Sequence, residues 1–267
     1  MTKILLILTY TVGFYFLVVL TTFFFQRSLL YLPSKEKIDI SDYSNTGLKE
    51  VEFTTSDGLV LKSLFKKPSS KDRSTILIFH GNAGHVGHRV DKFKHFIESG
   101  YGLLLLEYRG YGKNPGKTSE NGIYKDGQAA LNFLFKQNIL SKKIILYGES
   151  LGCGIATKLS TENSFGATIL EAPYTSIADV AQSHYWYLPA KWLVLDKHDI
   201  IGIIEDIKSP LLVMHGEKDN IINIQLGKKV FNAAPEPKQA LYLPNAGHNN
   251  LFDFNLYEKI FSFLKKH

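Results

Sequence analysis

The sequence predicts an α/β protein with a mostly parallel sheet, covered by helices on both faces and preceded by a transmembrane helix. Two observations lead to this prediction. An uncharged apolar stretch lies near the N-terminus, and from about residue 51 short apolar runs alternate with longer amphipathic ones. Strands that alternate with helices over such a length imply right-handed crossovers and parallel pairing.

The N-terminal stretch Ile4–Phe25 has 22 residues without a charged side chain, Asn, Gln or Pro. As a helix it would span roughly 33 Å, enough to cross a hydrocarbon core of about 30 Å. Its threonines are tolerable there, because their hydroxyls can bond to the carbonyls of the helix itself.

Two alternatives for this stretch are a cleaved signal peptide and a buried core helix. The apolar run is longer than a usual signal-peptide core, and no small-x-small cleavage site precedes Gln26 and Arg27. A core helix rarely lacks a polar face over six turns. We therefore expect a single-pass membrane anchor over residues 1–26. Its orientation stays open, because basic residues flank both ends: Lys3 on one side, and Arg27, Lys35 and Lys37 on the other.

The rest of the chain divides into a polar connector over 27–50 and one α/β domain over 51–267. Expected strands lie at 51–55, 59–66, 75–79, 102–106, 143–147, 167–170, 210–215 and 239–243. Asp57-Gly58 predicts a hairpin between the first two. Expected helices lie at 90–99, 122–137, 151–161, 225–232 and 251–265. Residues 174–208 are rich in aromatic residues, lack a strand pattern and predict an inserted helical lid.

Composition excludes several classes of function. The formal charge is +6, but the lysines are scattered and no nucleic-acid motif accompanies them, so nucleic acid is not an expected partner. The single cysteine, Cys153, rules out an intramolecular disulfide and reads as a small buried residue of a helix. No Cys and His cluster at ligand spacing appears in the sequence, so neither a metal nor a cofactor is expected.

Gly148-Glu149-Ser150-Leu151-Gly152 matches the G-x-S-x-G pattern between an expected strand and an expected helix. This is the context of a nucleophile elbow, in which a serine stands on a strained turn. Glycines two residues before and two after the serine allow the turn to approach the neighbouring backbone closely. We therefore predict Ser150 as a nucleophile.

A serine nucleophile needs a base and an acid that orients the base. Among nine histidines, His248 stands in a loop after the last expected strand and before the last helix. Asp219 follows the strand at 210–215, and its place between Ser150 and His248 gives the order Ser, Asp, His. Glu217 is the nearest alternative acid. These residues all follow the carboxyl ends of parallel strands, where open α/β folds place their sites.

A serine hydrolase also needs two backbone donors for the oxyanion. The N–H of Leu151, directly after the nucleophile, is the first candidate. The segment His80-Gly81-Asn82-Ala83-Gly84 follows the strand at 75–79, and its glycines allow the amides to turn inward. We assign the second donor to Asn82; the alternative is an ordinary glycine-rich turn.

Several motifs together resemble the Bem46-like α/β-hydrolases, which are similar to the ABHD13- and ABHD17-type serine hydrolases. They are His80–Gly84, Glu107–Asn114, Gly148–Gly152, Glu171–Ser176, Gly216–Asp219 and Gly247–Asn250, within roughly residues 48–265. The resemblance implies an α/β-hydrolase fold, the same Ser150, Asp219 and His248, and a structural role for Arg109. Cys153 departs from the family, in which many members have Gly or Ala at this position.

The expected function is therefore a membrane-anchored serine hydrolase that cleaves carboxylic esters or thioesters, with a lipid-like acyl substrate. Its substrate choice would lie in the aromatic segment 174–208. A serine peptidase of the same fold is one alternative. The other is a non-catalytic binding protein, which would not require the serine, aspartate, histidine and glycines together.

Overall fold

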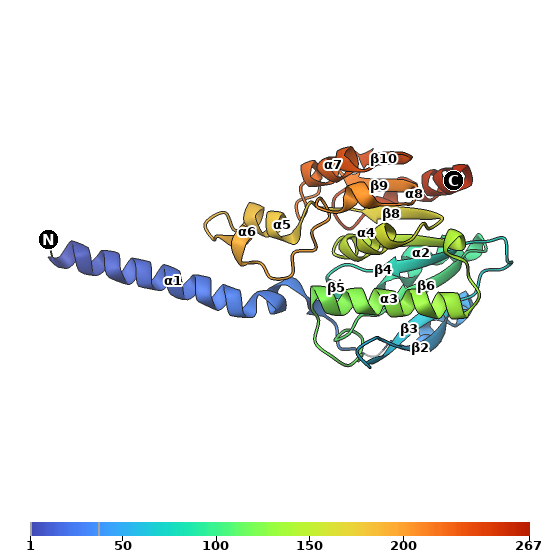
Figure 1. The fold of residues 1–267 in the computed structure, drawn as a ribbon, viewed down its shortest axis with the longest axis horizontal. Coiled ribbons are helices and arrows are strands. Elements are labelled where there is room, and N and C mark those ends of the chain that lie inside the picture. Colours follow the sequence, from blue (N-terminus) through green and yellow to red (C-terminus); the bar gives the residue numbers. More distant parts are fainter. Residues whose placement is uncertain (1, 37) are drawn as a thin grey trace.

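The computed structural model describes residues 2–36 and 38–267, so Met1 and Lys37, one of the flanking charges, lie outside it. Helix α1 (Thr2–Leu30) projects from an α/β domain that contains the rest of the described chain (Figure 1). The helix is long and apolar enough to cross a membrane, and its most apolar window is not buried. As predicted, hydroxyls of Thr9, Thr11 and Thr22 donate to carbonyls four residues earlier.

The domain is built on an eight-stranded sheet with the order β10-β9-β8-β7-β4-β6-β3-β2. β3 runs in the opposite direction to all the other strands, which are parallel to one another, so the sheet is mostly parallel, as predicted. The strands are β2 (Lys49–Thr54), β3 (Val60–Lys66), β4 (Thr75–Phe79), β6 (Gly102–Leu106), β7 (Ile144–Glu149), β8 (Ala167–Glu171), β9 (Leu211–Gly216) and β10 (Lys238–Leu243). β4, β6 and β8 are buried throughout, which explains their continuous apolar runs.

Helices cover both faces of the sheet. Alternate residues of β4 enter two different core clusters: Leu77 and Phe79 the first, Ile76 and Ile78 the second. The first cluster includes α3 (Glu120–Lys136), α4 (Gly152–Glu162) and α7 (Ile224–Ala233), and the second includes α2 (Val90–Glu98) and α8 (Leu256–Lys266). The helix expected at 251–265 is interrupted, because Asn255 has a φ of 56° between a 3₁₀ turn and α8. The α/β-hydrolase fold class predicted from the sequence is confirmed.

The connector (residues 27–50) contains short regular elements. Helix α1 runs to Leu30, and β1 (Leu32–Pro33) pairs in parallel with β5 (Ala83–Gly84). A 3₁₀ segment follows at Ile40–Thr46. The two-residue strands are held by hydrogen bonds such as Leu32 N–H to Asn82 O at 2.9 Å. Such short pairing leaves no periodic pattern in a sequence.

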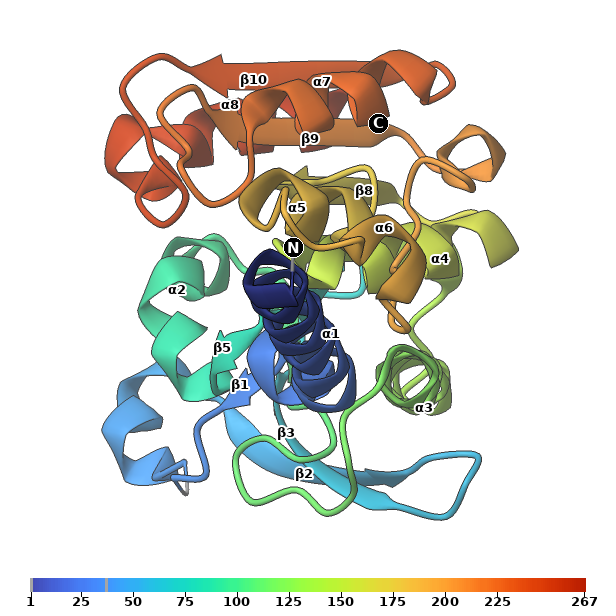
Figure 2. The same ribbon diagram turned by 90° about the vertical axis from the view of Figure 1, so that its left-hand side faces the viewer.

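The aromatic insertion (residues 174–208) lies beside the C-terminal half of α1 (Figure 2) and contains α5 (Ile177–His184), α6 (Ala190–Leu193) and a 3₁₀ turn at Ile204–Asp206. The Arg27 guanidinium donates two hydrogen bonds to Asp196, at 2.8 and 3.1 Å. The hydroxyl of Tyr31 lies 3.1 Å from His198 Nε2. Both contacts fix the end of the insertion to the end of α1.

Arg109 lies in the turn between β6 and α3 and is 6% exposed. Its guanidinium contacts two carboxylates: the fully buried Asp126 at 2.8 Å, and Asp57 of the β2–β3 hairpin at 2.9 Å. The backbone N–H of Arg109 also donates to Asp126. Arg109 therefore joins the hairpin to α3, which is the structural role that the family resemblance implied.

Replacing Arg109 by Met is expected to destabilise the domain by about 3–5 kcal/mol, because Asp126 would remain buried without its cationic partner. Lys125→Met is the matched control, since Lys125 contacts the same Asp57 from a half-exposed position and should cost less than about 1 kcal/mol. Urea unfolding of the detergent-solubilised protein measures both. Equal losses in the free energy of unfolding for Arg109→Met and Lys125→Met would contradict this structural role of Arg109.

His198 is expected to make stability depend on pH. Burial lowers its pKa from 6.5 to about 4, outweighing the nearby Asp196 carboxylate. As the pH falls from 6.5 towards 4, the unfolded chain binds a proton that the folded chain does not, so stability is lost over this window, by up to about 3 kcal/mol. His198→Gln should lose correspondingly less stability between pH 7 and pH 4. Parallel unfolding profiles for the two proteins would contradict the prediction.

Candidate active site

Ser150, Asp219 and His248 meet at the carboxyl edge of the sheet. Ser150 follows β7, Asp219 follows β9 and His248 follows β10. His248 Nε2 lies 3.1 Å from Ser150 Oγ, and His248 Nδ1 lies 2.7 Å from Asp219 Oδ2. The structure thus brings the three predicted residues into one hydrogen-bonded chain.

The turn at Ser150 is strained, and two glycines make it sterically possible. Ser150 has a φ of 51°, in the left-handed region that few non-glycine residues adopt. A Cβ on Gly148 would lie 2.6 Å from Cys153 Cα, and one on Gly152 would lie 2.0 Å from Phe79 O. These contacts agree with the predicted reason for both glycines. Cys153 is buried beneath this turn, as expected for a packing residue.

Asp219 is held by more partners than its histidine alone. Its Oδ1 accepts hydrogen bonds from the N–H groups of Ile221 and Ile222, at 2.9 and 2.8 Å. Burial by itself would raise the pKa of this carboxyl, but hydrogen bonds from His215 and His248 outweigh it and hold that pKa well below its usual range. Asp219 therefore stays ionised at neutral pH. The alternative acid, Glu217, has an exposed side chain.

His215 is a site residue that the sequence analysis did not single out. It is fully buried, and its Nε2 lies 2.9 Å from Ile222 O and 3.2 Å from Asp219 Oδ2. An N–H shared between these two oxygens would help to orient the acid, and His215 contacts the same oxygen, Oδ2, as the base His248. The sequence feature that could have identified His215 is its position at the end of a buried strand, four residues before Asp219.

The segment that contains Asn82 lies directly beside the nucleophile. A Cβ on Gly81 would be 3.6 Å from Ser150 Cβ. Asn82 is fixed from the other side, because its side chain donates to Leu30 O and its carbonyl accepts from Leu32 N–H. Among the described residues, the N–H groups of Asn82 and Leu151 have no protein acceptor. Both predicted donors therefore remain available to a substrate oxygen.

A group of partly buried charges lies beside the nucleophile. Lys92 of α2 contacts the carboxylates of Glu149 and Glu171, and Arg89 also binds Glu149. Burial would lower the pKa of Lys92, but the two carboxylates outweigh it and raise that pKa. Glu149 precedes Ser150, and the Ser150 N–H donates to the Glu171 carbonyl at 2.8 Å. The sequence analysis missed Lys92, since an amphipathic helix gives no sign of a lysine that pairs with carboxylates of the sheet.

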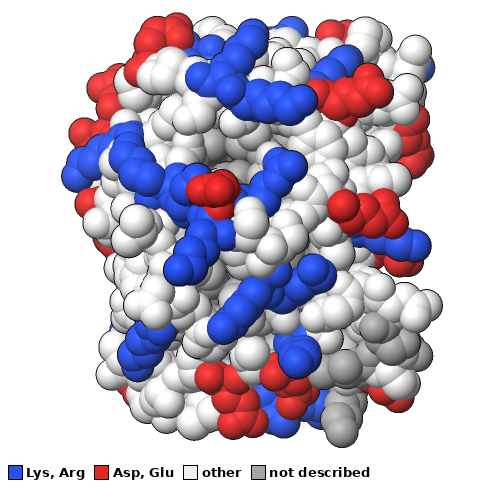
Figure 3. All heavy atoms as spheres, turned by 90° about the vertical axis from the view of Figure 1, so that its right-hand side faces the viewer, with Lys and Arg blue, Asp and Glu red and all other residues white. Residues whose placement is uncertain are grey.

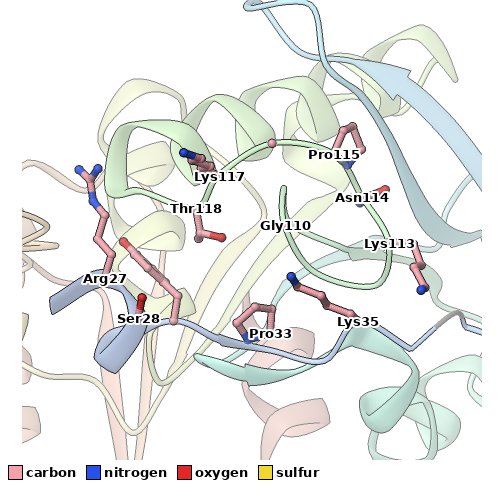
Figure 4. A pocket seen from close by; sticks show the side chains of 12 residues that line it. Arg27, Ser28, Pro33, Lys35, Gly110, Lys113, Asn114, Pro115, Lys117 and Thr118 are labelled. Carbon is pink, nitrogen blue, oxygen red and sulfur yellow. The ribbon is translucent and has the colours of Figure 1, made fainter. Parts of the chain in front are cut away.

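Two further features lie outside this constellation. Ligand atoms of Glu36, His85 and His88 lie within 4.8 Å of one another, a set that could hold a metal ion, although only His85 is buried. No spacing pattern in the sequence indicates this set, because Glu36 is remote from the histidines along the chain. A cavity of about 780 Å³ lies at the end of α1 (Figure 4), and its lining does not include Ser150, Asp219 or His248.

Comparisons with known proteins identify relatives of this chain. Residues 70–199 match the family model described as serine aminopeptidase, S33. The bem46 protein of Schizosaccharomyces pombe is 32% identical over 243 residues, covering 85% of this chain and 81% of that protein. The lysophosphatidylserine lipase ABHD12 of Danio rerio is 34% identical over 194 residues, 65% of this chain and 50% of that protein.

Among solved structures, the Pyrococcus furiosus esterase Pf2001 superposes with a TM-score of 0.72 at 18% identity, covering 88% of this chain and 98% of that one. At this identity the likeness establishes the fold. The sequence relatives establish the family: the chain belongs to the Bem46-like α/β-hydrolases and is a hydrolase of the esterase and lipase type.

Proposed function

We propose that the chain is a membrane-anchored serine hydrolase that cleaves carboxylic esters or thioesters through an acyl-enzyme. Residues 1–26 would form the anchor, 27–50 the connector and 51–267 the catalytic domain, with the aromatic insertion as its lid. The observation that carries this proposal is the hydrogen-bonded chain from Ser150 through His248 to Asp219.

The roles follow from the geometry. His248 Nε2 accepts the Ser150 proton as Oγ attacks the acyl carbon, and the ionised Asp219 stabilises the imidazolium through Nδ1–H. The N–H groups of Asn82 and Leu151 would donate to the oxyanion, each such donor contributing about 3–4 kcal/mol to the transition state. His248 then returns the proton to the leaving group, and water releases the acyl group by the same steps.

Lipid-like acyl compounds are the proposed substrates. ABHD12, a relative, is named as a lysophosphatidylserine lipase. An apolar helix attached beside the site would also keep the enzyme where such substrates accumulate. The description of the matching family model favours a second candidate, a serine peptidase with the same triad.

A fluorophosphonate probe is expected to label the wild-type protein and not Ser150→Ala, because only an activated serine reacts. Ser183→Ala, at an exposed serine whose hydroxyl donates to Val180 O, should label normally. In parallel, p-nitrophenyl esters of rising chain length and peptidyl p-nitroanilides distinguish esterase from peptidase. Folded wild-type protein that neither labels nor hydrolyses any of them would point to a binding protein.

Asp219→Asn is expected to lower kcat by about 10⁴ with KM little changed, since the imidazole would lose the carboxylate that sets its tautomer and stabilises its charge. Glu217→Gln, at the exposed alternative acid, should keep its activity. Steady-state hydrolysis of the best p-nitrophenyl ester measures both variants. The assignment of the acid is wrong if Glu217→Gln is the inactive one.

A further inference from the structure

The tip of the aromatic insertion exposes large apolar side chains beside α1. Trp186 is 79% exposed and Trp192 is 83% exposed. Their neighbours on the same tip are exposed as well: Tyr185, Tyr187 and Leu195. Tryptophan and tyrosine favour the boundary between headgroups and acyl chains, whereas water-facing surfaces rarely group them.

Polar side chains of α1 bind the backbone of this tip. The Tyr15 hydroxyl donates to Tyr187 O at 2.8 Å. Gln26 donates to Leu193 O at 3.3 Å and accepts from Leu195 N–H at 2.8 Å. Within the insertion, Gln182 donates to the carbonyls of Trp186 and Leu188. Backbone groups outside a regular helix are tolerated at membrane depth only when they are paired in this way.

The length of α1 sets the depth of the tip. Lys3 must lie at the far membrane surface, and from Lys3 to Tyr15 the helix rises only about 18 Å. A hydrocarbon core of about 30 Å leaves Tyr15 roughly 10 Å inside the near boundary. Because Tyr15 contacts Tyr187, we propose that residues 185–195 insert into the near leaflet beside α1, with Trp186 and Trp192 among the lipids. This inference rests on the proposed membrane anchoring.

Basic side chains lie where the lipid headgroups would then be. The cavity at the end of α1 is lined by Arg27, Lys35, Lys113 and Lys117, with no acidic residue in its lining (Figure 4). Anionic headgroups attract such clusters. The face turned away from α1 carries Lys and Arg side chains with Asp and Glu among them, as expected for a surface in water (Figure 3).

Insertion of the tip would also orient the active site. The end of α1 is bonded to Asn82 at the carboxyl edge of the sheet, and this edge carries Ser150. With α1 in the bilayer, the same edge faces the leaflet (Figure 1). The substrate class that fits this placement is an acyl lipid presented by the membrane itself.

The two tryptophans of the chain both lie on the tip, so tryptophan emission, excited selectively at a wavelength that tyrosine does not absorb, reports on it alone. Full-length protein would be reconstituted into vesicles of phosphatidylcholine and phosphatidylglycerol, with or without brominated acyl chains. Trp186→Phe and Trp192→Phe each leave one natural reporter. The control is Trp186→Phe/Trp192→Phe/Leu140→Trp, because exposed Leu140 follows the end of α3 far from α1 (Figure 1).

Brominated lipids are expected to remove most of the emission of both natural tryptophans and none of that of the control. Emission that stays unquenched in vesicle-bound protein would overturn the proposed insertion. A wavelength typical of water would then mean that the tip is exposed to solvent, and a blue-shifted wavelength would mean that other parts of the protein cover the tip. Vesicle flotation tests the membrane anchor separately. A protein that does not float with the vesicles would overturn both the anchor and the insertion of the tip. Fluorophosphonate labelling of Ser150 in detergent depends neither on the anchor nor on the insertion of the tip, so it tests the proposed serine hydrolase chemistry independently.

Discussion

The close approach of α4 to the end of β4 is the constraint on which the site depends. Gly152 lies so near Phe79 O that no side chain could be accommodated. This contact brings the start of α4 against the segment His80–Gly84, so the candidate oxyanion donors Asn82 and Leu151 come from two chain segments that touch. The left-handed conformation of Ser150 follows, because the chain must reverse between β7 and α4 within these few residues.

Buried and partly buried charges hold the elements around this turn. Lys92 attaches α2 to the carboxylates of the last residues of β7 and β8. On the other side, Arg109 attaches the β2–β3 hairpin to α3. A buried ion pair contributes little net stability, but removing one partner is costly. Such groups therefore specify how the elements meet more than they stabilise the fold.

Sequence patterns predicted the parts of the structure whose physical signal is local. Continuous apolar runs gave β4 and β6 within their observed bounds, and the elbow motif located the turn at Ser150. The patterns failed where pairing is short or distant: β1 with β5, the break at Asn255, and the contacts of His215 and Lys92. These depend on which residues meet in space. Neither hydrophobic periodicity nor spacing along the chain contains that information.

The end of α1 contributes directly to the candidate site. Leu30 O accepts the Asn82 side chain and Leu32 N–H donates to the Asn82 carbonyl, while the Tyr111 hydroxyl donates to the same carbonyl. Two of these three bonds come from the last turn of α1 and the residues that follow it. Since Asn82 is the proposed second oxyanion donor, its position depends on how the end of the helix is docked. An apolar helix that served only as a tether would need no such bonds, so α1 and the segment His80–Gly84 are best understood as one structural unit.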